Sequence, residues 1–398
     1  MEKLVGKTLV FTDQHFGIKG NSPLRQRIGV RAVKSMLGTV KRDGISNVIF
    51  CGDYFHQRSS VSVDTLNIAY KCLQALAKQC KVYMVLGNHD LFNKSTVDVN
   101  SINIFRDNAS IVVVDYPIEV MLNAKKALLV PWLADLSAFK PETYDFVFGH
   151  FDISAKFLIA SYAQEHSRAA AASNDVAASI DCDSSLGQPI EQTSKPEELL
   201  GSFIDLAKRD GTVFAGHIHQ HKEMSARGRK FIFVGTPYEQ NLGDIGCKCG
   251  YYEIDELGNY AFIETEGVPK HVQFKSSAIA ACGVDSFDFS QARGNIVQKV
   301  YDVDVSMEDD LKINQKIASY KPYEELLPDY QVALDLTKSE SECSQGHLVK
   351  MLKKSKLDYV KGYIDTLDTK ALSQDGIDKD KLFSLMKSYY SRVVGEQE

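Results

Sequence analysis

The chain has 398 residues, of which 44% are hydrophobic and 25% are charged, and its formal net charge is −6 at pH 7. These proportions are typical of a globular protein with a sizeable core, and the length allows two or three domains. No apolar run approaches the roughly 20 residues that cross a bilayer, and the first residues lack a signal-peptide pattern, so we expect a cytoplasmic protein with no membrane partner.

The first part of the chain alternates short apolar runs with helical patterns. Strands are predicted at Thr8–Phe11, at Asn47–Cys51 and from Val82 onward. Ser22-Pro23 opens a helix between the first two strands, and Ser60 is expected to cap another helix before the third. Repeats of this kind form a parallel sheet with helices outside it, so we predict an α/β fold.

The middle of the chain contains more strands and one long interruption. Strands are predicted at Ile111–Val114, Ala127–Val130, Phe146–Phe148, Val213–Ala215, Phe231–Val234 and Tyr251–Ile254. Between Ser154 and Pro196 large apolar residues give way to Ala, Ser, Asp, Gln and Pro, which predicts a long surface excursion. A helix is predicted to follow at Glu197–Lys208.

Changes in pattern predict three domains, with residues 1–268 as the first. Residues 269–340 are expected to form a small α+β unit, with elements at Val300–Val305, Asp309–Ile317 and Tyr330–Leu336. Residues 341–398 are expected to form two amphipathic helices after the polar segment Lys338–Gln345. An apolar helix stripe needs a cover, which is either the chain's own core or a partner.

The eight cysteines are scattered along the chain. Cys51, Cys72 and Cys80 fall on apolar faces, which indicates reduced core thiols. Cys247 and Cys249 form a close pair, but no second pair or histidine lies at zinc-finger spacing, so a structural role is expected.

Side chains that can bind metal or move protons follow the predicted strands. The candidate ligands are Asp13, His15, Asp53, Asn88, His150, His217 and His219. Oxygen and nitrogen donors without a thiolate suit Mn²⁺, Mg²⁺, Fe²⁺ or Zn²⁺. Seven donors exceed one tetrahedral ion, but they suit two ions that share a carboxylate. Two ions roughly 3.5–4 Å apart activate a water and stabilise both oxygens of a phosphoryl displacement.

The order and spacing of these residues resemble the calcineurin-like metallophosphoesterases over roughly residues 7 to 265. The motifs are Asp13-x-His15, Gly52-Asp53, Gly87-Asn88-His89-Asp90, Gly149-His150 and Gly216-His217-x-His219. Within that superfamily, Tyr54-Phe55-His56 and the segment from Gly235 to Gln240 are similar to SbcD-type and meiotic-recombination-type DNA nucleases. The size and tail are most similar to phage recombination endonuclease subunits, which work with an SMC-like coiled-coil ATPase.

The resemblance implies a β-sandwich core flanked by helices, a small α+β cap domain and a C-terminal helical tail. It assigns Asp13, His15 and His219 to one metal. It assigns Asn88, His150 and His217 to a second metal, with Asp53 bridging the two. His89 would protonate or stabilise the leaving oxygen, and His56 would assist DNA placement or exonucleolysis at the mouth of the site.

The resemblance also implies cofactors and partners. Two divalent ions are expected, with Mn²⁺ favoured and Mg²⁺ as the second choice. The expected partners are DNA, an SMC-like ATPase bound by the tail, and a second copy of the chain in a homodimer. A phage-encoded protein of this kind would work in the host cytoplasm, in DNA recombination and repair.

Two points stay open from the residues alone. Lys19, Arg25, Arg27, Arg31 and Arg58 could track a DNA backbone or form only a solvated helix face. His221, two residues after the last motif histidine, is expected in solvent.

The function also stays open. The metal centre alone does not separate a DNA nuclease from a phosphomonoesterase or cyclic-nucleotide phosphodiesterase, and a non-catalytic docking subunit is the third alternative.

Overall fold

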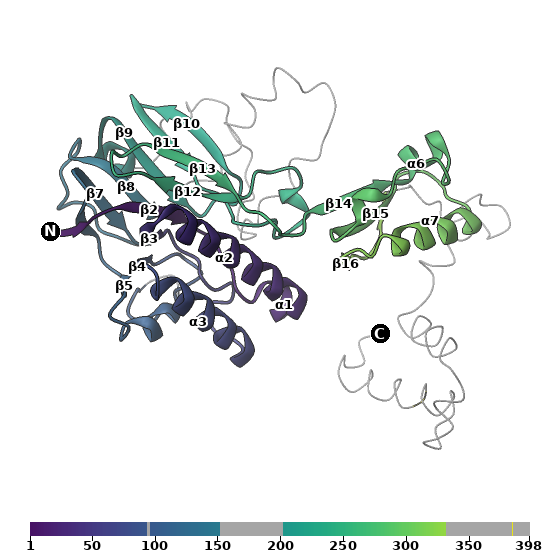
Figure 1. Cartoon of the computed structure of the whole chain (residues 1–398), viewed down its shortest axis with the longest axis horizontal. Helices are drawn as coiled ribbons and strands as arrows, with labels where there is room; N and C mark the ends of the chain where they lie inside the picture. Colours follow the sequence, from purple (N-terminus) through teal and green to yellow (C-terminus); the bar gives the residue numbers. More distant parts are fainter. Residues whose placement is uncertain (94–95, 152–201, 332–383, 385–398) are drawn as a thin grey trace. The chain divides into compact units, whose positions relative to one another are not determined.

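The computed structural model describes residues 1–93, 96–151, 202–331 and 384. The chain divides into two compact units, residues 1–272 and 273–398 (Figure 1). The predicted surface excursion at Ser154–Pro196 and the predicted tail helices lie outside the described residues, so the division at 268 and 340 stays a prediction. Among the described residues, no helix combines the length and apolar character needed to cross a membrane.

The first sheet of unit 1 has six strands in the order β13-β12-β2-β3-β4-β5. Their bounds are β2 Lys7–Phe11, β3 Ile45–Phe50, β4 Lys81–Val85, β5 Ile111–Val114, β12 Gly250–Ile254 and β13 Tyr260–Glu264. Strands β2 to β5 are parallel, as predicted, and β12 pairs antiparallel with β2. The sequence did not predict β13, an edge strand without a buried face.

The second sheet has seven strands in the order β1-β6-β7-β8-β9-β11-β10. Their bounds are β1 Glu2–Leu4, β6 Ile118–Leu122, β7 Lys125–Val130, β8 Tyr144–His150, β9 Ala207–Gly216, β10 Lys222–Ala226 and β11 Arg229–Phe233. Strands β7, β8, β9 and β11 are parallel neighbours. The sequence missed β1, β6 and β10, since β1 has only one buried residue and β6 only two.

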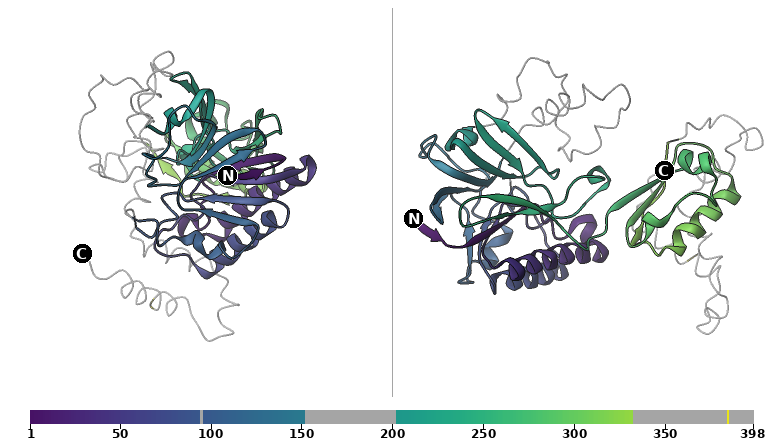
Figure 2. Two further views of the ribbon diagram at one scale, coloured as in Figure 1. Left: turned by 90° about the vertical axis from the view of Figure 1, so that its left-hand side faces the viewer. Right: turned by 45° about the horizontal axis from the view of Figure 1, so that its top comes forward.

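The two sheets pack face to face and enclose the main core. Alternate residues of the first sheet, such as Val10 and Ile49, lie in one buried cluster with Leu129, Phe148 and Phe214 of the second. The opposite side chains of the first sheet pack under helices α2 (Pro23–Asp43) and α3 (Val63–Ala77). Figures 1 and 2 show these helices along the outer face of that sheet. The predicted sandwich with flanking helices is confirmed.

The helices begin where local capping chemistry allows. Ser22 accepts a hydrogen bond from the backbone N–H of Arg25 and precedes Pro23 at the start of α2, as predicted. Ile18–Asn21 forms the short α1. The predicted cap of α3 was wrong, because Ser62 and not Ser60 accepts from the backbone of Thr65. Ser62 is extended and directly precedes the first helical residue, which is the geometry a cap requires.

The predicted helix at Glu197–Lys208 was also wrong in its described part. Residues Ser202–Leu206 form a 3-10 turn, η3, and β9 begins at Ala207. Ala207 pairs with Tyr144 of β8, and Ile204 and Leu206 are buried against the outer face of the second sheet. Strand pairing and burial therefore override the local helical pattern.

The described residues of unit 2 include both helices and strands. Its described elements are β14 His271–Lys275, which begins in unit 1, α6 Ser276–Cys282, η5 Ser290–Ala292, β15 Ile296–Tyr301, α7 Met307–Ser319, β16 Glu324–Glu325 and β17 Asp329–Tyr330. The strand predicted at Val300–Val305 begins and ends earlier in the chain, and α7 is longer than predicted. Strands β14, β15 and β16 form one sheet, and β17 pairs with β15.

The described cysteines confirm the predicted core thiols. Cys51, Cys72 and Cys80 are buried and free, and Cys249 is buried and free as well. Burial raises the pKa of the Cys72 thiol to about 12 and that of the Cys80 thiol to about 11. These thiols are neutral packing groups and not nucleophiles.

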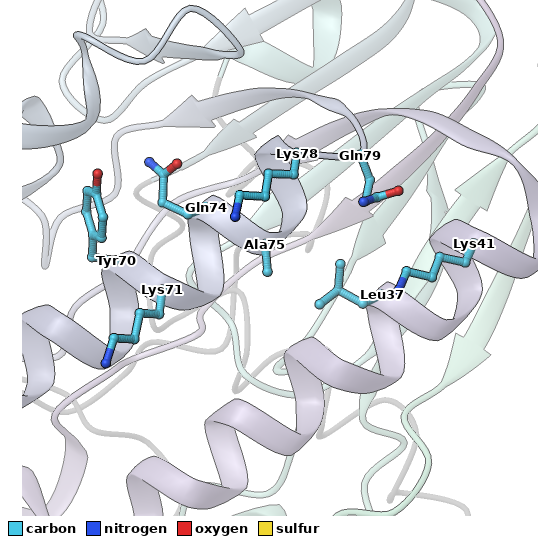
Figure 3. Close-up of a pocket in the computed structure, with 8 residues that line it drawn as sticks. All are labelled: Leu37, Lys41, Tyr70, Lys71, Gln74, Ala75, Lys78 and Gln79. Atoms are coloured by element: carbon cyan, nitrogen blue, oxygen red, sulfur yellow. The ribbon is translucent and has the colours of Figure 1, made fainter.

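A groove of about 490 Å³ runs between α2 and α3 on the outer surface of unit 1 (Figure 3). It is lined by Leu37, Lys41, Tyr70, Lys71, Gln74, Ala75, Lys78 and Gln79. No predicted site residue lines this groove, and its three lysines face no lining carboxylate. It is a surface separate from the predicted metal ligands.

Candidate metal centre

All seven predicted ligands lie at the carboxyl ends of strands in the two stacked sheets. Asp13 and His15 follow β2, Asp53 follows β3 and Asn88 follows β4, and these are adjacent parallel strands. His150 ends β8, and His217 and His219 follow its neighbour β9. Open α/β sheets place their ligand sites at this edge. The structure therefore places these seven side chains at the same edge of the two sheets.

One group of donors consists of Asp13, His15 and His219. His15 Nε2 lies 3.1 Å from His219 Nε2 and 3.6 Å from Asp13 Oδ1. Asp13 Oδ1 lies 3.8 Å from His219 Nε2 and, although buried, accepts no hydrogen bond. A divalent cation needs several lone pairs directed at one point. Here two imidazole nitrogens lie near a buried carboxylate oxygen that accepts no hydrogen bond, so the three atoms suit such a cation.

A second group consists of Asn88, His150 and His217. Asn88 Oδ1 lies 3.0 Å from His150 Nε2 and 3.1 Å from His217 Nδ1. Asp53, His150 and His217 also bring ligand atoms within 4.8 Å of one another. A neutral amide oxygen, a carboxylate and two imidazoles suit a borderline divalent ion.

Asp53 lies between the two groups. Its Oδ2 is 3.7 Å from His15 Nε2 in the first group and 3.3 Å from His150 Nε2 in the second. Its Oδ1 accepts a hydrogen bond of 2.7 Å from the backbone N–H of His89. One carboxylate therefore faces both groups with the same oxygen, which is the arrangement a bridging ligand needs.

Burial sets the protonation of the histidines. Desolvation lowers the pKa of His15 and of His217 to about 4, so both rings are neutral and can offer a lone pair. Burial would also lower the pKa of His150, but the charge of Asp53 and its hydrogen bond raise that pKa to about 9. A cation bound here would displace the His150 proton, because only the neutral imidazole is a ligand.

The backbone at the donors is strained. Asp13, His15, Asp53 and His217 have φ of 52°, 48°, 63° and 84°, in the left-handed region that non-glycine residues rarely adopt. Gly87 lets the loops after β3 and β4 approach, since a Cβ there would overlap the backbone nitrogen and carboxylate of Asp53. Strain of this kind persists only where surrounding contacts hold it, and it gathers at functional sites.

Comparison with known proteins decides the family. Residues 6–221, more than half of the chain, match the family model described as calcineurin-like phosphoesterase. The chain belongs to the calcineurin-like metallophosphoesterases. The resemblance predicted from the motifs is confirmed, and members of this family are hydrolases of phosphate esters.

One curated protein and one solved structure are similar to parts of this chain. Exonuclease subunit 1 of Enterobacteria phage T4 is 23% identical over 257 residues, which are 63% of this chain and 64% of that protein. The match therefore spans less than two thirds of the relative's length. A solved structure described as a novel archaeal phosphodiesterase is 12% identical with a TM-score of 0.31, and it covers 65% of this chain and 99% of that one.

Asp90 ties together the loops of this metallophosphoesterase that carry Asp53 and Asn88. It is fully buried, and its carboxylate accepts from the backbone N–H groups of Asp53 and Tyr54 at 2.9 Å and of Gly87 at 3.0 Å. Burial, together with the nearby charge of Asp53, raises the pKa of Asp90 to about 7. The sequence placed Asp90 in the right motif, but its role as an anchor appears only in the structure.

Replacing Asp90 by alanine is expected to destabilise the phosphoesterase by about 3–5 kcal/mol. The substitution leaves at least three buried N–H groups without an acceptor, and each costs about 1–3 kcal/mol. Urea denaturation measures the change in the free energy of unfolding. Asp107→Ala, at an exposed aspartate, is the control. A loss below about 1 kcal/mol for Asp90→Ala would contradict the anchoring role.

His89 and His56 adjoin the first group of donors. The rings of His89 and His15 are 5.0 Å apart, and those of His89 and His56 are stacked at 5.6 Å. His89 Nδ1 lies 2.7 Å from the backbone carbonyl of His56, so Nδ1 carries the proton and donates it to that oxygen. Nε2 is then the atom of His89 that can exchange a proton with a substrate.

Trp132 is a neighbour of the centre that the sequence analysis missed. Its ring centroid lies 5.2 Å from that of His217 and 5.7 Å from that of His150. Its backbone N–H donates to the carbonyl of Leu86, the residue directly after β4. Trp132 follows β7, and β7 lies beside β8, which ends at His150. The sequence could have pointed to Trp132, because it is an aromatic residue at the end of a predicted strand.

Emission from Trp132 is expected to report metal binding, because it is the only tryptophan in the chain. Titrating Mn²⁺ into the metal-free protein should quench its fluorescence, since paramagnetic ions quench nearby indoles. His217→Ala should lose most of the response, and Trp132→Phe supplies the tyrosine baseline. Unchanged emission in a sample that elemental analysis shows to hold manganese would contradict this placement.

The expectation for His221 was wrong, and the question left open for Arg25 is answered. His221 is half-buried and not in solvent, because its ring stacks on Phe262 at 4.1 Å and its Nδ1 lies 3.2 Å from the carbonyl of Phe233. Arg25 is buried, with Nη1 2.9 Å from His271 Nε2, and cannot reach a DNA backbone. Of the other predicted basic contacts, Lys19, Arg27 and Arg31 are exposed and Arg58 is partly exposed.

Proposed function

We propose that this metallophosphoesterase is a metal-dependent DNA nuclease, with exonuclease and endonuclease activity, that hydrolyses phosphodiester bonds within a recombination and repair complex. The observation that carries the proposal is the single Asp53 oxygen facing two groups of donors. A centre of this kind suits displacement at phosphorus. DNA as the substrate is supported by the similarity to an exonuclease subunit and by the Tyr54-Phe55-His56 motif.

Two divalent ions fit the donors, and we propose Mn²⁺ with Mg²⁺ as the second choice. Asp13, His15 and His219 would hold one ion. Asn88, His150 and His217 would hold the other, with Asp53 shared by both. The bound ions would lower the pKa of the attacking water and neutralise charge on the phosphoryl group.

The chain's own groups complete the reaction. His89 would act as an imidazolium: its Nδ1–H donates to the carbonyl of His56, and its Nε2 would transfer its own proton to the departing 3′ or 5′ oxygen, which leaves a neutral ring. His56 would help to place the DNA end beside it. Lys19, Arg27 and Arg31 would contact the phosphate backbone from the exposed surface of α1 and α2.

The full-length protein with Mn²⁺ should be assayed on linear duplex DNA, circular single-stranded DNA and a phosphomonoester. We expect cleavage of linear duplex and of circular single strands, and little release of phosphate from the monoester. A preference for the monoester or for a cyclic nucleotide would favour those alternatives over the nuclease. Absence of any Mn²⁺-dependent hydrolysis would favour the non-catalytic docking subunit.

Deleting the chain from Gly346 onward is expected to separate two activities. We propose that the tail binds an SMC-like coiled-coil ATPase, supported by the amphipathic pattern of the tail and by the word "subunit" in the relative's name. The truncated protein should lose co-purification with the ATPase and keep Mn²⁺-dependent cleavage. Loss of both together would contradict a modular tail.

A homodimer is also part of the proposal, with the groove between α2 and α3 as its surface (Figure 3). Tyr70 is 47% exposed and Leu37 is half-buried there, and they provide an apolar centre flanked by Lys41, Lys71 and Lys78. Light scattering of the full-length protein tests this assembly, and a monomer at micromolar concentration would contradict it.

A further inference from the structure

Three buried polar side chains form a line at the start of β14. Arg25 of α2, His271 at the first position of β14 and Glu239 after β11 are only 2%, 4% and 3% exposed. Arg25 Nη1 lies 2.9 Å from His271 Nε2, and His271 Nδ1 lies 3.1 Å from Glu239 Oε2. The backbone N–H of His271 donates to the same Glu239 oxygen. We call these residues the Arg25–His271–Glu239 triad.

The chemistry of the partners fixes the proton in this triad. A guanidinium only donates, so His271 Nε2 must accept from Arg25. The remaining ring nitrogen, Nδ1, then carries the proton and donates it to the carboxylate of Glu239. His271 is thus a neutral ring held in one tautomer between a buried cation and a buried anion.

The stability of the fold alone does not explain why the Arg25–His271–Glu239 triad is buried. Taking charges out of water costs several kcal/mol per ion, and well-packed apolar residues of similar volume often serve stability as well or better. A buried ionic group can instead select one arrangement of the segments that it joins. Here the triad joins α2, the start of β14 and the segment that contains Glu239.

The residues on either side of Glu239 hold the loop that carries the first group of metal donors. The hydroxyl of Tyr238 donates to the carbonyl of Gln14 at 2.8 Å. The side-chain amide of Gln240 donates to the carbonyl of Asp13 at 2.6 Å. Both side chains are buried. The segment 238–240 is therefore held by the triad at its centre and holds residues 13 and 14 with its two neighbours.

The loop that this segment holds is strained. Asp13 and His15 both have φ near 50°, and such conformations persist only when surrounding contacts over-determine them. The two bonds from Tyr238 and Gln240 end on the backbone carbonyls of this loop. Placement of segment 238–240 thus bears directly on where the Asp13 and His15 side chains point.

We infer that the Arg25–His271–Glu239 triad is a positioning device for the Asp13–His15 loop. It sets the position of segment 238–240, and through Tyr238 and Gln240 it preorganises the donors of the first metal group. Its effect on catalysis rests on the proposed function.

The test uses full-length Glu239→Ala and Glu239→Gln proteins. Electron paramagnetic resonance follows Mn²⁺ binding to each metal-free protein. Glu239→Ala should weaken binding at one of the two positions by about 10–100-fold, the range seen when an outer partner of a metal ligand is lost. Glu239→Gln keeps an acceptor oxygen for His271 and should recover most of that affinity. The position formed by Asn88, His150 and His217 should be unaffected.

Arg229→Ala is the matched control for a merely structural role. Arg229 is also a buried arginine, bonded to the carbonyl of Ala207 at 2.7 Å. It begins β11, at the opposite end of the strand from the edge where the donors gather. This variant should lower the melting temperature and leave Mn²⁺ binding unchanged. If Glu239→Ala does only the same, the inference is overturned.

A second readout does not depend on bound metal. In the metal-free protein, the imidazole nitrogen resonances of His15 and His219 should shift in Glu239→Ala, recover in Glu239→Gln and stay in place in Arg229→Ala. Resonances that stay in place in all three variants overturn the inference, whatever the wild type binds. A wild type that binds no Mn²⁺ while these resonances respond would instead contradict the proposed function and support the positioning role.

Discussion

Replacing Asp53 by asparagine is expected to reduce Mn²⁺-dependent DNA cleavage by at least about 10³-fold, because the loss of one electrostatic group at a reaction centre already costs about 10²–10³. Asp53 is expected to cost more, since its Oδ2 faces both donor groups. The amide keeps an oxygen for the His89 backbone N–H, so the loop should stay folded. Cleavage of linear duplex DNA under single-turnover conditions measures the loss.

The control for this substitution is Asp107→Asn, which makes the same chemical change at an exposed aspartate of the same unit. It should cleave DNA at the wild-type rate. Elemental analysis should show that Asp53→Asn retains fewer than two manganese ions per chain, because a neutral amide does not compensate two cations. Two ions retained at wild-type affinity would show that Asp53 is not shared between them.

Replacing His89 by asparagine is expected to slow DNA cleavage by about 10²–10⁴-fold, the usual contribution of a positioned general acid. The asparagine amide can still donate to the carbonyl of His56, so the change removes proton transfer more than it removes structure. The manganese content should stay at the wild-type level, because His89 belongs to neither of the two principal donor groups. Single-turnover cleavage and elemental analysis measure these two quantities separately.

The leaving group provides the sharper test of His89. A nitrophenyl phosphodiester releases an acidic phenol that departs without protonation, whereas a DNA sugar oxygen does not. His89→Asn should therefore be impaired far less on the nitrophenyl ester than on DNA. Equal losses on both substrates would assign His89 to positioning and not to proton donation. His221→Asn, at a half-buried histidine outside the donor groups, should be near wild type on both.

The losses expected for Asp53→Asn and His89→Asn both depend on how the fold holds the site residues in place. The donors sit on strained loops, and the rings of His15 and His217 are desolvated enough to stay neutral. Asp90 accepts a hydrogen bond from the backbone of Asp53, and Tyr238 and Gln240, on either side of Glu239 of the triad, donate to the backbone of the Asp13–His15 loop. The strained and desolvated donors are thus held by hydrogen bonds from other buried polar side chains. The two stacked sheets provide the rigid frame that such a site needs.

Local pattern was sufficient for the strands that carry the donors. β2, β3, β4, β8 and β9 are buried runs that end at glycine or polar residues, and this signal does not depend on distant contacts. Features that depend on distant pairing were predicted poorly. Edge strands such as β13 bury little, and the start of β9 looked helical until its pairing with β8 was known.

The sequence by itself determined which residue types stand at the strand ends, and therefore that oxygen and nitrogen donors meet at one edge of two sheets. That inference needs only the period of a strand and the direction of parallel pairing. Only the tertiary structure decided that one oxygen of Asp53 faces both groups, that Trp132 packs on His217, and that Arg25 is buried against His271. These contacts join residues from 38 to 246 positions apart. The local sequence pattern does not determine such contacts, because they depend on how strands and helices pair and pack in the folded chain.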